Sequence, residues 1–436
     1  MSPLEHASRE EIDAYQDAAL VPLLAYLQAN SPFYQRQFAT LGFEVADIRT
    51  VADLARLPTT SKQELQEHNW DFLCVPRRDV AEYCSTSGTL GRPVTIALTA
   101  ADLARLHYNE YLSFACADGR PDDLYQLMLT LDRQFMAGVA YYGGIRQTGA
   151  GVIRMGPGNL AAQLDTIRQL EPTVLVAVPS FVVALVAHAH ATGFDLTTSS
   201  VRRIVCIGES IRDEQLQPNA LARRITDGWN VQLYSTYAST EKQTAFTECG
   251  HGRGGHHQPE LLIFEIVDEQ GRPLPAGQFG ELTITTLGVA GMPLLRYRTG
   301  DICTYDDAPC ACGRTTRRLG PIVGRQQQLL KYKGTSIYPQ AIFNVLHTVP
   351  EVAAYVVEAS TSDLDTDELE ISVALPAGAD EAAVLARLRA ALRAGLRVLP
   401  TLRVQPLPEI LARQQAGDPR KPARFIDRRQ TRLPFE

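Results

Sequence analysis

The sequence has no excess of positive charge. Its 436 residues contain 42 lysines and arginines against 49 aspartates and glutamates, which gives a formal net charge of −7 at pH 7 and a pI near 5.8. A chain with this balance offers no basic field to nucleic acid or to an anionic lipid surface. We therefore expect no nucleic-acid partner.

The sequence also lacks a segment typical of a signal peptide or a membrane span. The N-terminus, MSPLEHASREEIDAYQ, is acidic and helix-like and has no apolar signal core. The most apolar stretch is Thr173–Gly193, which Pro179 and two histidines interrupt. It predicts a buried strand followed by a helix. We expect a cytoplasmic protein that does not enter a membrane.

Several chemical signatures are missing as well. The phosphate-loop pattern G-x-x-x-x-G-K-[ST] does not occur. No Ser–His–Asp or Cys–His nucleophile can be argued, since Cys84 has no identifiable histidine partner. Eight cysteines in a chain of this length do not suggest a disulfide framework. Five of them stand in apolar or strand-like contexts that predict small buried side chains: Cys74, Cys84, Cys116, Cys206 and Cys303.

The first three hundred residues alternate strand-like and helix-like runs. A helical pattern, NLAAQLDTIRQL, stands among short β-branched runs: LYQLMLTL, GVIRM, VLVAVP, VRRIVCIGES and WNVQLYSTY. This rhythm predicts an α/β domain with a largely parallel sheet. Ligands of such sheets gather at the carboxyl ends of the strands, where the polar segments PS, GES and STYASTE stand.

The pattern changes twice in the second half of the chain. After Glu260, LLIFEIVDEQGRPLPAGQFGELTITT predicts a β-meander with tight Gly/Pro turns. Beyond Gly324–Lys333, a helix–strand–strand–helix pattern predicts a small α+β domain. We therefore expect a large domain over residues 1–324 and a smaller domain over 325–436.

Ser/Thr/Gly-rich YCSTSGTLGRP (Tyr83–Pro93) offers unobstructed backbone N–H groups and hydroxyls, as phosphate-holding loops do. It is followed, in order, by YASTE (Tyr237–Glu241), YRTGD (Tyr297–Asp301), GR (Gly324–Arg325) and KYKGTSIYP (Lys331–Pro339). This series resembles the core motifs of the adenylate-forming superfamily of acyl- and aryl-CoA ligases. LPTTSKQEL (Leu57–Leu65) and CACGRT (Cys310–Thr315) look like the phenylacetate–CoA ligase subfamily in particular. The resemblance covers nearly the whole chain.

The resemblance implies a site for ATP and Mg²⁺. Tyr237 would stack on adenine, Thr240 would bond a phosphate and Glu241 would hold Mg²⁺ through oxygen. Asp301 would accept hydrogen bonds from the ribose hydroxyls with help from Arg325, and Gly208, Glu209 and Ser210 would line the adenine and acyl pockets. The β- and γ-phosphates would be held by Ser85, Thr86, Ser87, Gly88, Thr89, Gly91 and Arg92, the last standing where relatives often have lysine.

By the same resemblance, Lys421 of RKPARFIDRR would reach the acyl carboxylate and the α-phosphate during adenylation. The acid pocket would involve Tyr141, Tyr142, Pro179, Gly208 and Ser235. Small and aromatic side chains there suit a compact aryl or arylacetic acid better than a long fatty chain.

Three thiols and an imidazole can complete a tetrahedral Zn²⁺ site. Cys249 and His256 have the spacing seen in the phenylacetate–CoA ligase group, and Cys310 and Cys312 match its downstream pair. Four protein ligands would close the site, so its role would be structural; His251 and His257 are alternative ligands. The resemblance also implies that the domain over 325–436 is mobile about a hinge at 324–328. Many relatives have aspartate shortly after the GR pair, where this chain has Gln326–Gln328.

These features predict an ATP- and Mg²⁺-dependent ligase that joins a carboxylic acid to coenzyme A through an acyl-adenylate. Three alternatives stay open. The acceptor could be an amine, a hydroxyl or a carrier-protein thiol; the chain could be a non-catalytic nucleotide-binding regulator; or the Cys/His cluster could bind a protein partner. The sequence also leaves the oligomeric state open, with a homodimer as one alternative.

Overall fold

A computed structural model describes residues 3–86, 93–333, 335–361, 367–415 and 423–429. The chain forms two compact units. The first contains the described residues up to Thr86 and those from 93 to 322, and the second those from Val323 onward. Short 3₁₀ helices occur at Pro3–His6, Val45–Asp47, Val51–Arg56, Asn69–Phe72, Arg77–Asp79, Leu196–Thr198 and Gln326–Gln328.

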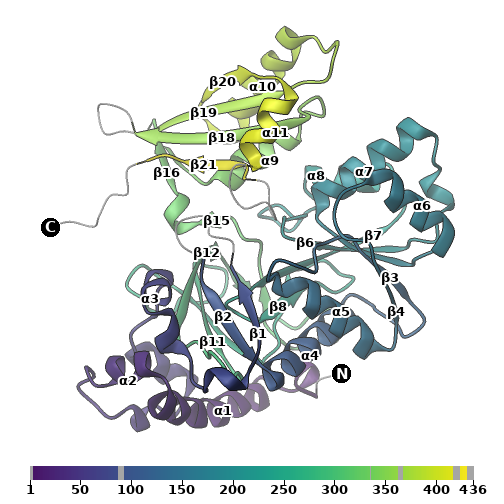
Figure 1. Ribbon diagram of the computed structural model, residues 1–436. Coiled ribbons are helices and arrows are strands. Elements are labelled where there is room, and N and C mark those ends of the chain that lie inside the picture. The colour runs from purple at the N-terminus through teal and green to yellow at the C-terminus, as the bar shows by residue number, and fades with distance from the viewer. Residues whose placement is uncertain (1–2, 87–92, 334, 362–366, 416–422, 430–436) are drawn as a thin grey trace. The chain divides into compact units, whose positions relative to one another are not determined.

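A large mixed sheet organises the first unit (Figure 1). Its described strands lie in the order β13 (Tyr305–Asp306), β14 (Arg318–Leu319), β9 (Gly255–His256), β8 (Thr244–Thr247), β7 (Gln232–Ser239), β6 (Arg203–Ile207), β5 (Val174–Ala177), β3 (Leu124–Leu127) and β4 (Gly151–Arg154). From β7 to β4 neighbouring strands are parallel, and from β7 to β13 they are antiparallel. The predicted α/β class is confirmed, with a sheet that is only partly parallel.

Helices cover both faces of the parallel strands, as Figure 1 and the two hydrophobic cores on either side of the sheet show. One face carries α4 (Ala100–Cys116) and α5 (Met136–Thr148), and the other α6 (Leu160–Leu170), α7 (Pro179–Thr192) and α8 (Ala220–Thr226). In β5, Val174 and Val176 pack on the α4/α5 side, whereas Leu175 and Ala177 pack on the other. Because both faces are covered, β5 is a continuous apolar run rather than an alternating one.

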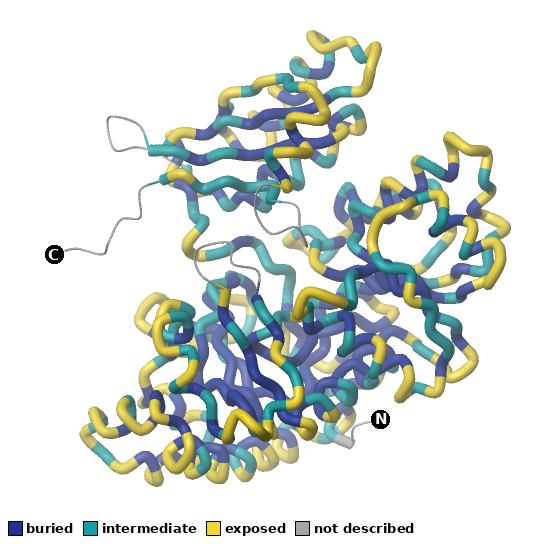
Figure 2. The backbone as a smooth tube through the Cα atoms, viewed as in Figure 1, coloured by how far each residue is buried: buried dark blue, intermediate teal, exposed yellow. Residues whose placement is uncertain are grey.

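Two smaller sheets and the N-terminal helices complete the first unit. The N-terminal helices are α1 (Arg9–Asn30), α2 (Pro32–Phe38) and α3 (Lys62–Glu67). One small sheet is the hairpin of β1 (Val80–Ser85) and β2 (Thr95–Thr99). The other contains the antiparallel strands β10 (Leu262–Val267), β11 (Gly280–Thr286) and β12 (Tyr297–Cys303). The predicted meander is therefore present. One hydrophobic core joins these elements, with Leu24, Ile96 and Leu282 among its buried members. Figure 2 shows the buried parts of the backbone in dark blue.

The second unit is an α+β fold around strands in the order β20 (Thr401–Val404), β19 (Asp367–Ala374), β18 (Ala354–Thr361) and β21 (Phe425–Asp427). Helices α9 (Pro339–His347) and α10 (Glu381–Leu396) share a core with Val357 and Ile371. Helix α11 (Leu407–Gln415) packs on the other face, where Ile410 contacts Val356. The remaining strands are β15 (Gly324–Arg325), β16 (Leu330–Tyr332) and β17 (Thr335–Ile337). The predicted helix–strand–strand–helix order is found in α9, β18, β19 and α10.

Among the described residues, no helix has both the length and the apolar character needed to cross a membrane. The stretch Thr173–Gly193 folds as β5 followed by α7, as the sequence predicts. Pro179 stands in the first turn of α7, where its missing N–H breaks no helical hydrogen bond.

Candidate functional site

The base of the predicted phosphate loop is closed by backbone pairing between the two strands that flank it. The Thr86 backbone N–H donates to the Val94 carbonyl over 3.0 Å, and the Val94 N–H donates to Thr86 Oγ1 over 3.0 Å. Ser85 ends β1, and its N–H donates to the Gln134 carbonyl. The other residues predicted to hold phosphate, Ser87, Gly88, Thr89, Gly91 and Arg92, lie outside the described residues.

The carboxyl ends of the parallel strands bring the predicted acyl and adenine segments to one edge of the sheet. Gly208 follows β6 with φ of 74°, a conformation that glycine adopts without strain. The Glu209 carboxylate accepts hydrogen bonds from the Ser180 backbone N–H and hydroxyl, at 2.9 and 3.0 Å. Since Ser180 follows Pro179 at the start of α7, these bonds join the Gly208 segment to the Pro179 segment.

A buried ion pair supports the same edge of the sheet. Arg212 Nη2 lies 3.1 Å from Glu248 Oε2, and the carboxylate also accepts from the Ser235 backbone N–H at 3.3 Å. Burial raises the pKa of Glu248, and the Arg212 guanidinium opposes that rise. Arg212 also stands next to Ser210, whose hydroxyl donates to the Arg212 carbonyl. Neither Arg212 nor Glu248 was predicted, because no local pattern distinguishes them from surface charges.

Tyr237 and Asp301 come together from different sheets. The Tyr237 hydroxyl, at the end of β7, donates to Asp301 Oδ2 in β12. Gly300 has φ of 79° with no other atom near the position of a Cβ, so the backbone conformation, not space, requires glycine there. The register of β12 against β11 shifts at this point. The YRTGD motif therefore places Asp301 beside Tyr237.

Two lysines close to these residues were not predicted. Lys62 Nζ, on α3, lies 3.8 Å from the largely buried Glu241 Oε1. Lys242 is fully buried, and its Nζ lies 3.5 Å from the centroid of the Tyr237 ring. Thr240 is half-buried at the same turn. Lys62 belongs to the LPTTSKQEL motif, but that motif does not indicate that the lysine lies close to Glu241.

The two tyrosines predicted to line the acid pocket have different environments on α5. Tyr141 is buried, and its ring packs edge-on against Phe114 at 5.9 Å. Tyr142 is exposed, with the Arg154 guanidinium 5.8 Å from its ring centroid. Hydrophobic packing accounts for Tyr141, and a pocket role for either residue stays a prediction.

Cys249, His256, Cys310 and Cys312 form a compact group, with their ligand atoms all within 4.8 Å of one another. The Cys249 and Cys310 sulfurs are 3.7 Å apart, close to the separation of about 3.8 Å that tetrahedral Zn–S bonds of about 2.3 Å require. Cys312 Sγ lies 3.5 Å from His256 Nε2. The donor set and its spacing therefore fit a tetrahedral metal ion. His251 and His257, the alternative ligands, are not in this group.

The surroundings of the group suit metal ligation. Burial, and then the nearby Arg314 and Arg318 guanidiniums, lower the pKa of His256 to about 3, so the imidazole is neutral at pH 7. His256 Nδ1 lies 3.1 Å from Thr316 Oγ1, which leaves Nε2 toward the sulfurs. Cys116 packs against the cluster as well. Because Cys116 is far from these four residues in the sequence, no local pattern predicts this contact. None of the eight cysteines, all of them within the described residues, forms a disulfide.

The predicted hinge residues lie in the second unit. Arg325 belongs to β15, and Gln326–Gln328 form a 3₁₀ turn. A Cβ on Gly324 would lie 2.2 Å from the Tyr338 ring, so only glycine permits this close packing. Lys421 lies outside the described residues, and β21 begins four positions later.

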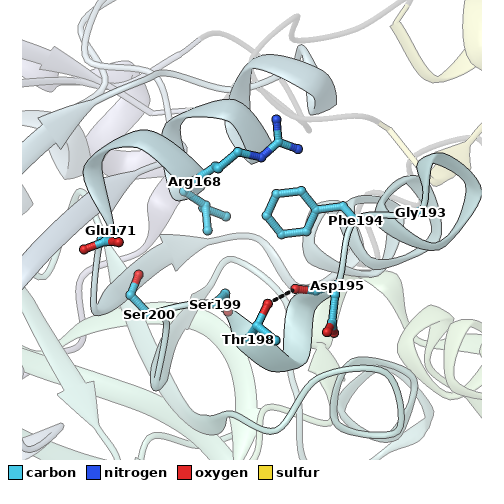
Figure 3. A pocket seen from close by; sticks show the side chains of 9 residues that line it. Arg168, Glu171, Gly193, Phe194, Asp195, Thr198, Ser199 and Ser200 are labelled. Carbon is cyan, nitrogen blue, oxygen red and sulfur yellow. Dashed lines mark hydrogen bonds between the residues drawn. The ribbon is translucent and has the colours of Figure 1, made fainter.

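A surface pocket of about 390 Å³ lies between the end of α6 and the segment after α7 (Figure 3). The Arg168 guanidinium stands 5.1 Å from the Phe194 ring centroid, and Thr198 donates to the Asp195 carbonyl. None of the described residues predicted for nucleotide, acid or metal lines it.

Residues 34–292 match the family model of AMP-binding enzymes. The chain belongs to the AMP-binding enzyme family. It is 31% identical over 380 residues to a phenylacetate-coenzyme A ligase of Thermus thermophilus, covering 86% of this chain and 84% of that one. It is 27% identical over 381 residues to the phenylacetate-coenzyme A ligase of Aromatoleum evansii, again with 86% and 84% coverage.

The crystal structure of 2-hydroxyisobutyryl-CoA ligase, in a postadenylation state with bound R3-HIB-AMP, has the same fold as this AMP-binding enzyme. The TM-score is 0.84 at 22% identity, covering 97% of this chain and 91% of that one. The predicted adenylate-forming fold, with its C-terminal domain, and the predicted likeness to phenylacetate–CoA ligases are thus confirmed.

Proposed function

We propose that this protein is an AMP-forming acid–thiol ligase that activates an aryl or arylacetic acid with ATP and transfers it to coenzyme A. The observation that carries the proposal is the pairing of Tyr237 with Asp301 at the carboxyl end of β7 in an AMP-binding enzyme, with Glu241 in the turn that follows this strand. The similarity to phenylacetate–CoA ligases over most of the chain supports the acid class and the thiol acceptor.

In the first step, a carboxylate oxygen attacks the α-phosphorus of ATP, the bond to the β-phosphate oxygen breaks, and pyrophosphate leaves. Tyr237 stacks on adenine while Asp301 accepts from the ribose hydroxyls, so the α-phosphate is held in line with the acid. Glu241 offers an oxygen ligand for Mg²⁺, which would offset the phosphate charge. Lys62, 3.8 Å from that carboxylate, adds a positive charge at the same place.

In the second step, the CoA thiol attacks the acyl carbon, loses its proton, and AMP leaves with the electrons of the broken C–O bond. The second unit is proposed to turn about residues 324–328 between the steps, which withdraws Lys421 and admits the thiol. The tight packing of Gly324 on Tyr338 supports a defined pivot at this position.

The Cys249–His256–Cys310–Cys312 group is proposed to hold a structural Zn²⁺. Four protein ligands leave no open coordination position, so the ion would stabilise the fold and take no part in the reaction. Glu248 precedes Cys249 in the sequence and pairs with Arg212. By fixing Cys249, the ion would therefore also help to hold Arg212 and the Gly208–Ser210 segment in place.

The test is a pyrophosphate-release screen over aryl, arylacetic and short aliphatic acids, with ATP and Mg²⁺, followed by chromatography of the products with and without CoA. We expect acid-dependent pyrophosphate release, with an aryl or arylacetic acid preferred and a thioester formed only with CoA. A condensed product and AMP formed without CoA would instead support an amide or ester synthetase. Absence of pyrophosphate release with every acid would contradict the ligase assignment.

A further inference from the structure

Lys242 is a buried cation beneath the ring of Tyr237. Lysine is scarce in this chain, with five lysines among its 42 basic residues. Lys242 is nevertheless 0% exposed, and its Nζ lies 3.5 Å from the Tyr237 ring centroid but 6.0 Å from that of Phe246. Burying an ammonium is unfavourable unless a partner attracts it, and the face of an aromatic ring is such a partner.

The ammonium and the Asp301 carboxylate act on different parts of the same side chain. Tyr237 donates its hydroxyl to Asp301, while Lys242 lies over its ring. The Phe246 ring is nearly parallel to that of Tyr237, at 6.2 Å and 28°, and borders the same place. Lys242 covers one face of the Tyr237 ring, but the residue is only half-buried, so part of its surface is accessible to solvent. These contacts fix both the plane and the rotation of the ring.

A cation on one face of an aromatic ring draws π-electron density toward itself. The opposite face then becomes less negative and stacks more favourably on an electron-rich purine. The phenol also becomes a better hydrogen-bond donor, which strengthens its bond to Asp301. A neutral side chain of the same length would keep the packing and lose both effects.

We propose that Lys242 is a positioning residue for the nucleotide, which holds and polarises the Tyr237 ring from one side so that the opposite face receives adenine. The proposal rests on the proposed function, in which Tyr237 stacks on adenine. It adds that this chain's affinity for ATP depends on a buried charge that does not touch the nucleotide.

The test compares Lys242→Met with Lys333→Met. Lys333 is an exposed lysine whose Nζ lies 4.9 Å from the Tyr332 ring, so it is another cation over a tyrosine, and it is not one of the predicted site residues. For folded variants with similar melting temperatures, we expect Lys242→Met to raise the Kd and KM for ATP about tenfold, with kcat within about twofold. Lys333→Met should leave the Kd for ATP unchanged.

A double-mutant cycle separates the ring contact from general packing. In a Tyr237→Leu background, Lys242→Met should change the Kd for ATP by less than about twofold, because the ring through which it acts is gone. Equal effects of Lys242→Met in both backgrounds would overturn the proposal. An unchanged Kd for ATP in folded Lys242→Met protein would also overturn it, as would a loss confined to kcat.

A spectroscopic measurement on the unmodified protein covers the case in which Lys242→Met does not fold. With ¹³C-labelled lysine, the Cε–Hε signal beneath the Tyr237 ring should be shifted upfield by the ring current and should shift again when ATP is added. No response of that signal to saturating ATP would overturn the proposal. If calorimetry finds no ATP binding by the wild-type protein, the proposed function fails together with this inference. If ATP binds but neither the Lys242 signal nor the Kd of the Lys242→Met variant responds as expected, only the inference fails.

Discussion

Arg429 Nη1 donates to the Leu329 carbonyl over 2.9 Å, so the C-terminal segment is bonded to the residues that follow the predicted hinge. Arg429 Nη2 also donates to the Gln327 carbonyl at 3.3 Å. The same guanidinium pairs with Asp427 at 2.6 Å and with Asp367 at 3.2 Å. One side chain thus connects the hinge turn, β19 and the strand β21 that follows Lys421.

We expect Arg429→Ala to loosen the hinge turn. Hydrogen bonds from a charged donor contribute about 1.5–3 kcal/mol, so amide hydrogen exchange over residues 326–332 should accelerate about tenfold or more. The matched control is Arg428→Ala, since Arg428 is exposed and pairs with Glu358 at the surface, where ion pairs contribute little. Equal exchange in the two variants would show that Arg429 does not hold this turn.

Glu241→Gln should raise the Mg²⁺ concentration needed for half-maximal pyrophosphate release by about tenfold, because a neutral amide is a poorer ligand for a hard cation. Lys62 would then lack its carboxylate partner at 3.8 Å. Glu214→Gln, at an exposed position, is the control. An unaltered Mg²⁺ requirement would remove Glu241 from the metal site.

Lys421→Ala should abolish adenylation and leave thioester formation from a supplied acyl-adenylate largely intact. The physical reason is that the lysine charge acts on the carboxylate and the α-phosphate while they are being joined, which happens only in the first step. Separate assays of the two half-reactions measure this. Equal losses in both would contradict the assigned role.

Purified protein should contain one zinc ion per chain by elemental analysis. Cys312→Ser should lower this content several-fold and lower the melting temperature, because loss of a closed structural site removes folding free energy. Cys74→Ser changes a buried thiol outside the group and should retain the metal. Stoichiometric zinc in the Cys312→Ser protein would exclude the proposed ligand set.

Glu110 should make stability fall as pH rises. Burial raises its pKa to about 8, partly offset by the hydrogen bond at 2.9 Å from Asn109 Nδ2. Between the unfolded value of about 4.3 and about 8, the native state binds one more proton than the unfolded state. Stability from this group is therefore full below pH 4, declines through that window and is lost above it.

Glu110→Gln removes this titration. Relative to wild type, its melting temperature should rise by about 5 °C or more between pH 5 and pH 8. Glu10→Gln, at an exposed position of α1, is the control and should show no such rise. A constant difference between Glu110→Gln and wild type across this range would mean that the Glu110 carboxyl is ionised throughout.

The elements that sequence patterns predicted share a local cause. The apolar run at Val174–Ala177 and the helical spacing at Leu160–Leu170 depend on periodicity within a few residues, and both elements form as expected. By contrast, α11 and β21 follow the predicted helix–strand–strand–helix pattern without having been predicted. Their stability comes from docking on β18, a contact between residues far apart in the chain.

The sequence by itself determined the family, the order of the motifs and the composition of the Cys/His group, because residue types and their short-range spacing can be read from it without knowing the fold. Only the tertiary structure decided that Lys242 lies under Tyr237, that Glu248 holds Arg212 and that Cys116 packs against the thiol cluster. Such contacts depend on which charged and polar side chains packing removes from water. That is a property of the whole assembled core, and no local stretch of sequence specifies it.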